Sequence, residues 1–219
     1  MKIKMVDIPG HDFQMLNTEV TQKFYNFIMG ENPSHFKGEN NPVEKVSWYD
    51  AIYFCNELSE MFGFIPVYEV DGETDVTTWD YIPHIGDEII GNVTMNEYAD
   101  GFRLPTIEEW EYAARGGRNY TYAGSNDLDE VGWYGYNSGK RTHPVARKKA
   151  NRYGLYDMSG NVWEWCWDVD LDLDYSNDRY FCGGSWDNYD DDCEVGSRIG
   201  CHANGRSGLI GFRLVRTIK

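Results

Sequence analysis

The stretch CGGSWDNYDDDCEVGSRIGCHANGRSGLIGFRLVRT, residues 182–217, has two framed ends and an irregular middle. Its ends have framework character, with GGSW at 183–186 and strand-like apolar spacing in GFRLV at 211–215. Residues 187–209 are rich in Gly, Asp, Ser and Asn, and they follow neither a helical nor a strand period. A long irregular segment held between two structured ends is usually a functional loop. We therefore predict that residues 187–209 form a binding surface and that the rest of the chain is its scaffold.

Composition limits the classes of protein to which the chain can belong. Its 219 residues suit one large domain or two small ones, and an aromatic content of 16% excludes a disordered chain. The formal net charge of -16 at pH 7 argues against a nucleic-acid partner, because phosphate binding requires a basic face. The acidity favours solubility, with a divalent cation held by some of the carboxylates as the alternative.

Cysteine content and hydropathy bear on the compartment. The 5 Cys are an odd number without zinc-binding spacing, so at least one thiol is free or paired outside the chain. No secretory leader opens the sequence, and no apolar run reaches the length of a membrane span. These features alone favour the cytoplasm, although a chain trimmed of its leader has the same pattern.

Capping signals predict three helices in the first half of the chain, each beginning at Thr or Ser and ending at Gly. They run from Thr18 or Thr21 to Gly30, from Ser47 with Asp50 to Gly63, and from Thr106 with Glu109 to Gly116. The residues expected on their apolar faces include Phe24, Phe27 and Ile28 in the first helix and Ala51, Phe54, Cys55, Leu58 and Met61 in the second. Short strands are expected near residues 5–10 and 67–70 and within 73–100. This order indicates one α+β domain over residues 1–219, with the binding segment at about 183–213.

The motif NRYGLYDMSGNVWEWCWD, residues 151–168, alternates around its tryptophans. Trp163 and Trp165 are predicted to share one face of a strand, and Glu164 points to the other. A Glu in that place needs a partner. An oxygen-coordinated cation is one answer. The other is that Glu164 pairs with an Arg, such as Arg103 or Arg213, or stays in contact with water, and spacing alone favours this second answer.

A series of motifs runs in order from residue 8 to residue 216. They are IPG at 8, EVT at 19, NPS at 32, PVEKVSWYDA at 42, FCNELS at 54, GFRLPTIEEWEYAARGG at 101, YAGS at 122, HPV at 143, NRYGLYDMSGNVWEW at 151, GGSW at 183 and GFRLV at 211. Together they resemble the formylglycine-generating enzyme (sulfatase-modifying factor) family. The resemblance implies a C-type-lectin-like fold with little regular secondary structure.

The same resemblance implies a structural calcium ion in the turn before Trp163. The residues carried over as its ligands are Asp157, Met158, Gly160, Val162 and Glu164. Asp157 stands where Asn is common in the family, which changes the charge of the site and keeps an oxygen donor. The family's other calcium site has no counterpart between Val131 and Val145.

The family's oxidases bind copper through two thiolates on the segment after GGS, five residues apart. In this chain those positions fall on Asn188 and Cys193, so a single thiol is present. An Asn amide is a poor ligand for Cu(I), which prefers soft sulfur donors. We therefore expect no copper and no catalysis, with Cys193 as a buried residue or one half of a disulfide.

A second resemblance is to the variable proteins of diversity-generating retroelements, which use the same fold type. Their C-terminal cassette lies between GGSW and GFRLV, and adenine-directed rewriting of AAY codons never yields Lys, Gln, Met, Trp or Glu. Residues 187–209 contain no Lys, Gln, Met or Trp, and their one Glu, Glu194, lies in a framework-like stretch. An ordinary polar loop is the alternative, but it does not easily explain the residues Ile199, Cys201, His202 and Leu209 scattered through it.

This resemblance predicts which side chains face a ligand. They are Asp187, Asn188, Tyr189, Asp191, Asp192, Ser197, Ile199, Gly200, Cys201, His202, Asn204, Gly205, Ser207, Gly208 and Leu209. Val195, Arg198, Ala203 and Arg206 are expected to be framework.

The function implied by the second resemblance is display of a hypervariable site to an unknown macromolecular ligand, expected to be a protein. The location implied is the cell surface or the extracellular space, with the leader absent from this sequence and a cytoplasmic location left open. Two alternatives remain, namely a copper-dependent oxidase of the formylglycine-generating type and a calcium-stabilised structural domain.

Overall fold

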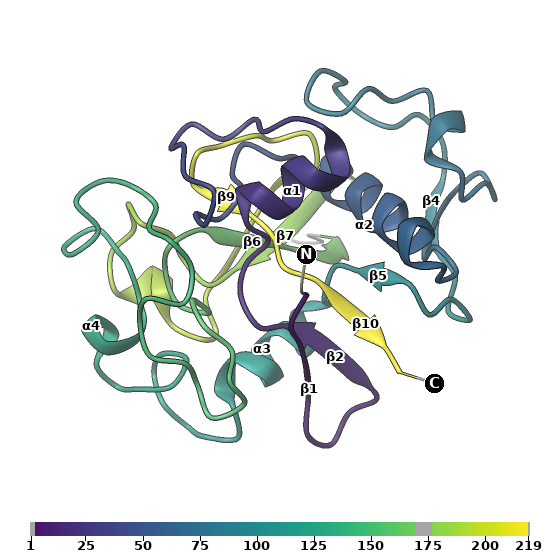
Figure 1. The fold of residues 1–219 in the computed structure, drawn as a ribbon. Coiled ribbons are helices and arrows are strands. Elements are labelled where there is room, and N and C mark those ends of the chain that lie inside the picture. Colours follow the sequence, from purple (N-terminus) through teal and green to yellow (C-terminus); the bar gives the residue numbers. More distant parts are fainter. Residues whose placement is uncertain (1–2, 170–176, 219) are drawn as a thin grey trace.

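Short helices and strands, joined by long irregular segments, make up the fold (Figure 1). The computed structural model describes residues 3–169 and 177–218. In chain order the elements are β1 (Met5–Asp7), β2 (Phe13–Leu16), α1 (Gln22–Met29), α2 (Trp48–Phe62), β3 (Tyr68–Val70), the 3-10 helix η1 (Val76–Thr78), β4 (Val93–Met95), β5 (Phe102–Arg103), α3 (Ile107–Arg115), α4 (Leu128–Val131), β6 (Trp163–Val169), β7 (Asp178–Cys182), the 3-10 helix η2 (Asp191–Cys193), β8 (Arg198–His202), β9 (Ile210–Gly211) and β10 (Val215–Thr217). The α+β class and the low content of regular structure are as expected.

The two ends of the chain meet in one sheet of order β1-β2-β10-β5 (Figure 1). β10 pairs antiparallel with β2 on one side and with β5 on the other. The strand that ends the GFRLV motif is therefore an inner strand, and its Val215 is completely buried. Because an inner strand is hydrogen-bonded along both edges, the C-terminal end of the binding segment is fixed to the scaffold.

The three predicted helices are confirmed together with their caps. Thr21 caps α1, while Ser47 and Thr106 begin α2 and α3 within complete capping boxes. α1 and α3 end at Gly30 and Gly116, whose φ angles of 78° and 57° lie in the left-handed region that Gly adopts without steric cost. α4 was not predicted, because a helix of 4 residues is too short to show a period.

Two apolar residues expected to face the core are exposed instead. Phe27 of α1 is 58% exposed and Met61 of α2 is 51% exposed. α1 packs on α2 through Phe24 and Tyr25, whose rings both contact Phe54, and this packing turns Phe27 toward solvent. Met61 lies in the last turn of α2, beyond its buried stretch. For these two residues the predictions were wrong.

The stretch 73–100 folds back against α2, with short strands as expected. β4 pairs antiparallel with β3, which places Tyr68 opposite Met95. Asn56 of α2 holds this unit by donating hydrogen bonds to the carbonyl oxygens of Tyr68 and Thr74, at 2.8 and 3.0 Å. A buried amide bonded in this way fixes the excursion to the helix.

The Trp-rich motif forms β6, an inner strand of a second four-stranded sheet with the order β8-β7-β6-β9. Trp163 and Trp165 both contact Phe181 of β7, with ring centroids 5.2 and 5.3 Å apart. Glu164 lies between them in sequence and bonds Arg213, outside that aromatic group. The predicted alternation is thus confirmed, and it separates an aromatic face from a charged one.

Two expectations for the C-terminal stretch need correction. Residues 198–202 form strand β8, although no strand period was expected within 187–209. β8 lies at the edge of its sheet, so backbone bonds to β7 place it and its side chains need not alternate. The GFRLV segment, residues 211–215, is not one strand, because β9 and β10 flank residues 212–214, which are all buried.

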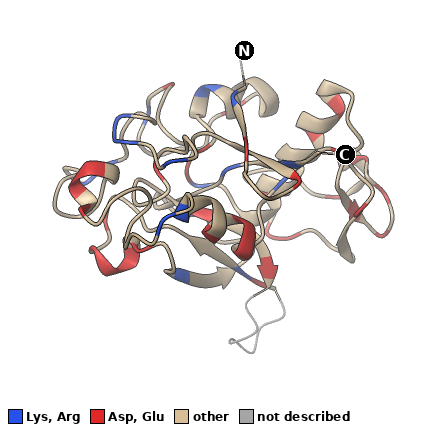
Figure 2. Cartoon of the chain, turned by 90° about the horizontal axis from the view of Figure 1, so that it is seen from below, with Lys and Arg blue, Asp and Glu red and all other residues tan. Residues whose placement is uncertain are grey.

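Acidic residues outnumber basic ones, and residues of both kinds are interspersed in the view of Figure 2. Asp and Glu total 36 against 20 Lys and Arg. Figure 2 shows acidic segments across the whole view, with basic ones among them. The face seen in this view is therefore not basic. Within residues 3–169 and 177–218, no helix has the length and apolar character needed to cross a bilayer.

Candidate binding surface

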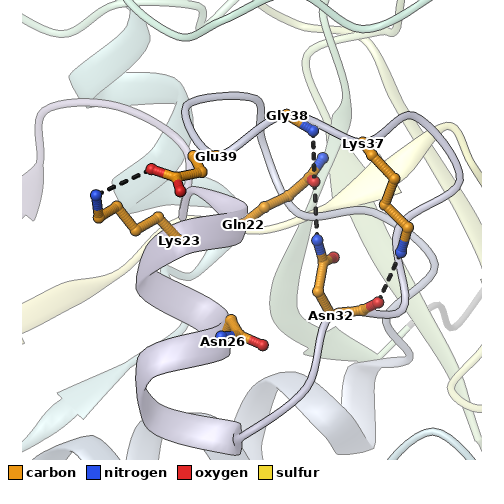
Figure 3. Close-up of a pocket in the computed structure, with 7 residues that line it drawn as sticks. All are labelled: Gln22, Lys23, Asn26, Asn32, Lys37, Gly38 and Glu39. Atoms are coloured by element: carbon orange, nitrogen blue, oxygen red, sulfur yellow. Dashed lines mark hydrogen bonds and ion pairs between the residues drawn. The ribbon is translucent and has the colours of Figure 1, made fainter.

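A polar groove of about 500 Å³ lies between α1 and the loop that follows it (Figure 3). Gln22 is central to this region. Its amide donates to the carbonyl oxygen of Phe36 at 2.7 Å and accepts from Asn32 at 2.9 Å and from the Gly38 N–H at 3.0 Å. These bonds order the loop, and none of the predicted ligand-facing residues lines the groove.

The predicted surface lies instead on the cassette, which we define as residues 187–209. All of its predicted ligand-facing residues are exposed or half-buried. Val195 and Ala203, predicted as framework, are only 3% and 1% exposed. Arg198, also predicted as framework, is exposed and its guanidinium lies 5.7 Å from the Tyr180 ring. Solvent access along the cassette is the condition that a binding surface must meet.

Asn188 differs from the other predicted ligand-facing residues, because its amide points inward. Its Oδ1 accepts from Trp163 Nε1 at 2.9 Å and from Ser185 Oγ at 2.5 Å, and its Nδ2 donates to Asp192 Oδ2 at 2.8 Å. Among the described residues, the Trp163 indole N–H has no acceptor other than Asn188 Oδ1. Asn188 therefore stabilises the start of the cassette, and its amide is not free for a ligand.

We expect Asn188→Ala to lower the free energy of unfolding by about 1–3 kcal/mol, because it leaves the buried Trp163 N–H without an acceptor. Tyr189→Ala and Asp191→Ala, at exposed neighbours, should change it by no more than about 0.5 kcal/mol. Urea unfolding followed by tryptophan fluorescence measures all three. Equal losses for Asn188→Ala and Tyr189→Ala would remove the distinction between framework and surface.

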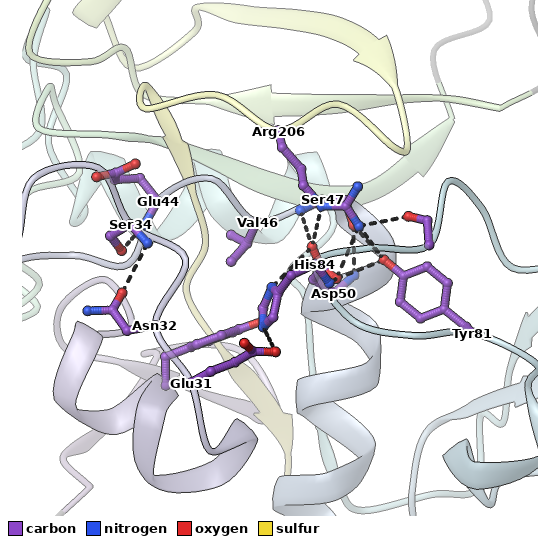
Figure 4. Close-up of polar contacts among 12 residues, drawn as sticks. Glu31, Asn32, Ser34, Glu44, Val46, Ser47, Asp50, Tyr81, His84 and Arg206 are labelled. Carbon is purple, nitrogen blue, oxygen red and sulfur yellow. Dashed lines mark hydrogen bonds and ion pairs between the residues drawn. The ribbon is translucent and has the colours of Figure 1, made fainter.

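The far end of the cassette is anchored by Arg206 (Figure 4). Its guanidinium donates to Asp50 Oδ2 at 2.9 Å, to the Tyr81 hydroxyl at 2.8 Å and to the Gly86 carbonyl oxygen at 2.9 Å. Burial alone would raise the pKa of Asp50, but the hydrogen bonds from Arg206 and from the His84 N–H hold it below its ordinary value. Asp50 also closes the capping box of α2, so Arg206 ties the cassette to that helix, as expected of a framework residue.

Strand β8 presents the middle of the cassette at the sheet edge. Ile199 is 45% exposed, and Cys201 is a half-buried free thiol. Burial, helped by the charge of Asp178, raises the pKa of Cys201 to about 11, so its reactive thiolate is disfavoured. His202 Nδ1 lies 2.9 Å from Asn204 Oδ1 and makes no ion pair within the described residues. Neither side chain is arranged for nucleophilic or acid–base catalysis.

Asn188 and Cys193, the residues expected at the copper positions, do not form a thiolate pair. Cys193 is a free thiol with no exposed surface. Burial, with the charges of Asp192 and Asp190, raises its pKa to about 12, which disfavours the thiolate that copper binds. Asn188 offers no sulfur, and its amide is already bonded. These residues do not fit a copper ion.

Glu164 is completely enclosed and pairs with Arg213. Its two oxygens accept from Arg213 Nη2 and Nε, both at 2.6 Å, and Oε2 also accepts from Trp110 Nε1 at 2.6 Å. Arg103, the other partner considered, pairs with Glu109 at 2.6 Å. The ion-pair alternative for Glu164 is therefore confirmed with Arg213.

Three buried carboxylates surround this single guanidinium. Glu19, Asp157 and Glu164 are 0%, 3% and 1% exposed. Burial, followed by the charges of Asp157 and Glu164, raises the pKa of Glu19 well above its ordinary value. Burial raises the pKa of Asp157 to about 6, although the Ala146 N–H donates to its Oδ2 at 2.7 Å. One Arg213 cannot neutralise all three carboxylates, so the region carries excess buried negative charge.

The donor set for the implied calcium ion fits in part. Asp157 Oδ1 is buried without a hydrogen-bond partner, and a hard cation is attracted by such an oxygen. Both oxygens of Glu164 are already engaged, by Arg213 and Trp110. Over residues 3–169 and 177–218, no group of three or more His, Cys, Asp and Glu is arranged around a metal position. The calcium ligand set stays a prediction that depends chiefly on Asp157.

Sequence reasoning missed the segment 132–138, which lies against the start of the cassette. The Gly135 N–H donates to the Asn188 carbonyl oxygen at 2.8 Å, and Ser138 Oγ donates to the Trp186 carbonyl oxygen at 2.7 Å. The segment has no helical or strand period and contains no charged residue, so nothing in the sequence marks it. It forms a fixed border of the binding surface.

The sequence profile of the sulfatase-modifying factor enzyme 1-like domain matches residues 3–218. The chain belongs to this family. It is 42% identical over 228 residues to a protein named chaperone protein LppX of Paenibacillus barcinonensis, across 94% of this chain and 80% of that protein. It is 48% identical over 227 residues to the formylglycine-generating enzyme of Mycobacterium tuberculosis, across 75% of this chain and 74% of the enzyme.

Solved structures of the sulfatase-modifying factor fold superpose over the whole chain. Treponema denticola variable protein 1 matches with a TM-score of 0.85 and 36% identity, covering 99% of this chain and 92% of that protein. The protein named CarF matches with a TM-score of 0.81 and 29% identity, covering 100% and 99% of the two chains. The C-type-lectin-like fold of the formylglycine-generating type is confirmed. The family thus includes enzymes, while the variable protein supports a ligand-binding scaffold.

Proposed function

We propose that this chain is a binding protein without enzymatic activity, which displays the cassette as a hypervariable site for a macromolecular ligand. The observation that carries the proposal is the division of the cassette between predicted ligand-facing residues, all exposed or half-buried, and the buried Val195 and Ala203. An extended exposed surface suits a macromolecule, whereas small molecules are usually held in concave pockets. The expected ligand is a protein, met at the cell surface or outside the cell.

A scaffold for exchangeable residues must hold both ends of the displayed segment. At the start, Trp186 Nε1 donates to the Gly208 carbonyl oxygen at 2.8 Å, which closes the cassette on itself. At the end, Arg206 is bonded to Asp50, and β9 and β10 lie in two different sheets. A preorganised loop loses less conformational entropy on binding, so many different side chains can serve on one frame.

The genomic test of hypervariability is the flanking DNA. We expect a reverse-transcriptase gene and a near-copy of the cassette-coding sequence whose mismatches fall at adenines. Sequencing of the locus in several isolates should show differences confined to codons for the predicted ligand-facing residues. An invariant cassette with no such copy nearby would reject the hypervariable site and leave a fixed binding surface.

The absence of oxidase activity is tested directly with Cu(I). The purified chain, incubated with Cu(I), oxygen and a Cys-containing peptide, should yield no aldehyde, because Asn188 and Cys193 cannot supply two thiolates. The formylglycine-generating enzyme of Mycobacterium tuberculosis, assayed under the same conditions, is the positive control. Aldehyde formed at a rate above that of free copper would overturn the assignment and favour the oxidase alternative.

A further inference from the structure

Three tyrosines line the border between the scaffold and the cassette. Tyr134 and Tyr136 come from the segment 132–138, and Tyr189 comes from the cassette. Their rings follow one another, with centroids 5.8 Å apart from Tyr134 to Tyr136 and 5.8 Å apart from Tyr136 to Tyr189. Tyr136 is 74% exposed and Tyr189 is 63% exposed. Exposed neighbouring tyrosines are typical of binding surfaces, because they give a large contact area with few rotatable bonds.

The relative position of these tyrosines is fixed by the backbone. The Gly135 N–H donates to the Asn188 carbonyl oxygen, so residues adjacent to Tyr136 and Tyr189 are directly bonded. A Cβ atom at Gly135 would lie 2.8 Å from that oxygen, which shows how closely the two segments approach. The backbone at Tyr136 and Tyr189 is therefore held in place without a ligand.

Several carboxylates without an ion-pair partner in the described part of the chain lie next to Tyr189 in the cassette sequence. Asp187, Asp190, Asp191, Asp192 and Glu194 lie within eight residues of sequence, and no ion pair among the described residues involves them. Figure 2 shows acidic segments, with some basic ones among them, on the left, the side on which Figure 1 labels α4.

Two scaffold lysines that lie near this border already have partners. Lys148 lies 4.2 Å from the centre of the Trp133 ring, and Lys149 pairs with Glu130 at 3.0 Å. Burial and the charges of Asp129 and Asp190 raise the pKa of Tyr134, which reflects acidic groups beside that ring. The row therefore presents aromatic faces with acidic groups beside them.

We propose that Tyr134, Tyr136 and Tyr189, with the cassette carboxylates, form a docking surface for a protein segment rich in Lys and Arg. Guanidinium and ammonium groups bind tyrosine faces and carboxylates at the same time, whereas an acidic segment would be repelled by this surface. The inference rests on the proposed function and adds the chemistry of the partner. It also assigns a binding role to two tyrosines outside the cassette, which stay the same when the cassette changes.

A peptide library displayed on phage is the probe that tests this inference. The immobilised full chain should recover peptides enriched in Lys and Arg, and raising NaCl from about 0.1 M to about 1 M should weaken their binding, because salt screens exposed charges. A parallel selection against a chain with five or more cassette residues exchanged tests the proposed function itself. That selection should recover a different set of peptides.

Point variants then separate the two claims. Tyr136→Ala should lower the affinity for the recovered peptides by about tenfold or more, as truncation of a central interface tyrosine does. Asp190→Asn with Asp191→Asn should weaken them and reduce their salt dependence. Tyr98→Ala and Glu97→Gln, exposed residues on another part of the chain, are the matched controls and should leave affinity unchanged. The melting temperature should stay within about 2 °C in every variant.

Each outcome decides one claim. Cassette-dependent peptides without excess Lys and Arg, or with full affinity for Tyr136→Ala, would overturn the docking surface and leave the proposed function intact. Peptides that bind both cassettes equally, or no peptides at all, would count against the proposed function and the inference together.

Discussion

Replacing Arg213 with Met should lower the free energy of unfolding by about 3–5 kcal/mol, because removal of one partner leaves a buried charge uncompensated. Arg213 has no exposed surface and pairs with both oxygens of Glu164. It also donates to the carbonyl oxygens of Leu16 and Tyr156, at 3.2 and 2.9 Å. Its loss therefore affects β2, β6 and the turn before β6 together.

The pH dependence of the Arg213→Met variant should identify the cause. Without the guanidinium, Glu19 and Asp157 lose the buried positive charge that lowers their pKa, so the pKa of each should rise further. The loss of stability should then be larger at pH 7.5 than at pH 5, and calorimetry at both pH values measures it. A loss independent of pH would mean that packing, and not charge, is what Arg213 supplies.

Arg115→Met is the matched control for the Arg213 variant. Arg115 pairs with Glu111 at the surface, where the two side chains are 39% and 31% exposed. Pairs of this kind contribute no more than about 1 kcal/mol. Double replacement of Arg213 and Glu164 by Met and Leu should recover part of the loss, since the uncompensated Glu164 charge disappears as well.

Local signals predicted the framework well. Thr21, Ser47 and Thr106 are capping residues whose side chains bond backbone N–H groups within the first turn of their helices. Because these contacts are local in sequence, the sequence alone predicts them. The alternation that separates Trp163 from Glu164 is local in the same sense. These features set the helices and the central strand without reference to the rest of the chain.

Contacts over long sequence distances were beyond local patterns. Glu19 reaches Val162 across 143 positions, and no period in either segment indicates this pairing. β8 is held by backbone hydrogen bonds to β7. Because every residue type except Pro can make such bonds, the sequence does not indicate this pairing. Asn188 was predicted to face a ligand because its type fits the cassette, and only the position of Trp163 turns its amide inward. The sequence thus predicted which segment forms the surface, but not that the amide of Asn188 within it points inward.

Replacing Asp157 with Asn should stabilise the chain at pH 7.5 in the absence of divalent cations. The folded-state pKa of Asp157 is raised to about 6 from an ordinary 3.8, so its contribution to stability is present below pH 3.8 and lost as the pH rises through 6. The Asp157→Asn variant avoids this loss, so its free energy of unfolding should rise by at most about 3 kcal/mol. Asn tolerates the positive φ of 56° at this position and can keep the bond from the Ala146 N–H.

The stability of the Asp157→Asn variant should therefore fall less steeply between pH 4 and 6 than that of the natural chain. Some pH dependence should remain, because burial also raises the pKa of Glu19. Asp12→Asn, at an exposed carboxylate, is the control and should leave the profile unchanged. A profile identical to that of the natural chain would mean that Asp157 is already ionised at low pH, against the pKa shift argued from its burial.

Calcium should reverse the order of stability, so that the natural chain becomes more stable than the Asp157→Asn variant. A cation bound at the free Asp157 Oδ1 offsets the buried negative charge, so calcium in place of chelator should raise the melting temperature of the natural chain. Asn keeps an oxygen donor but loses the charge, so the rise should be smaller in the variant. Equal rises would exclude Asp157 as a ligand, and no rise in the natural chain would reject the calcium expectation. In either case the excess charge around Arg213 would have to be relieved by protons.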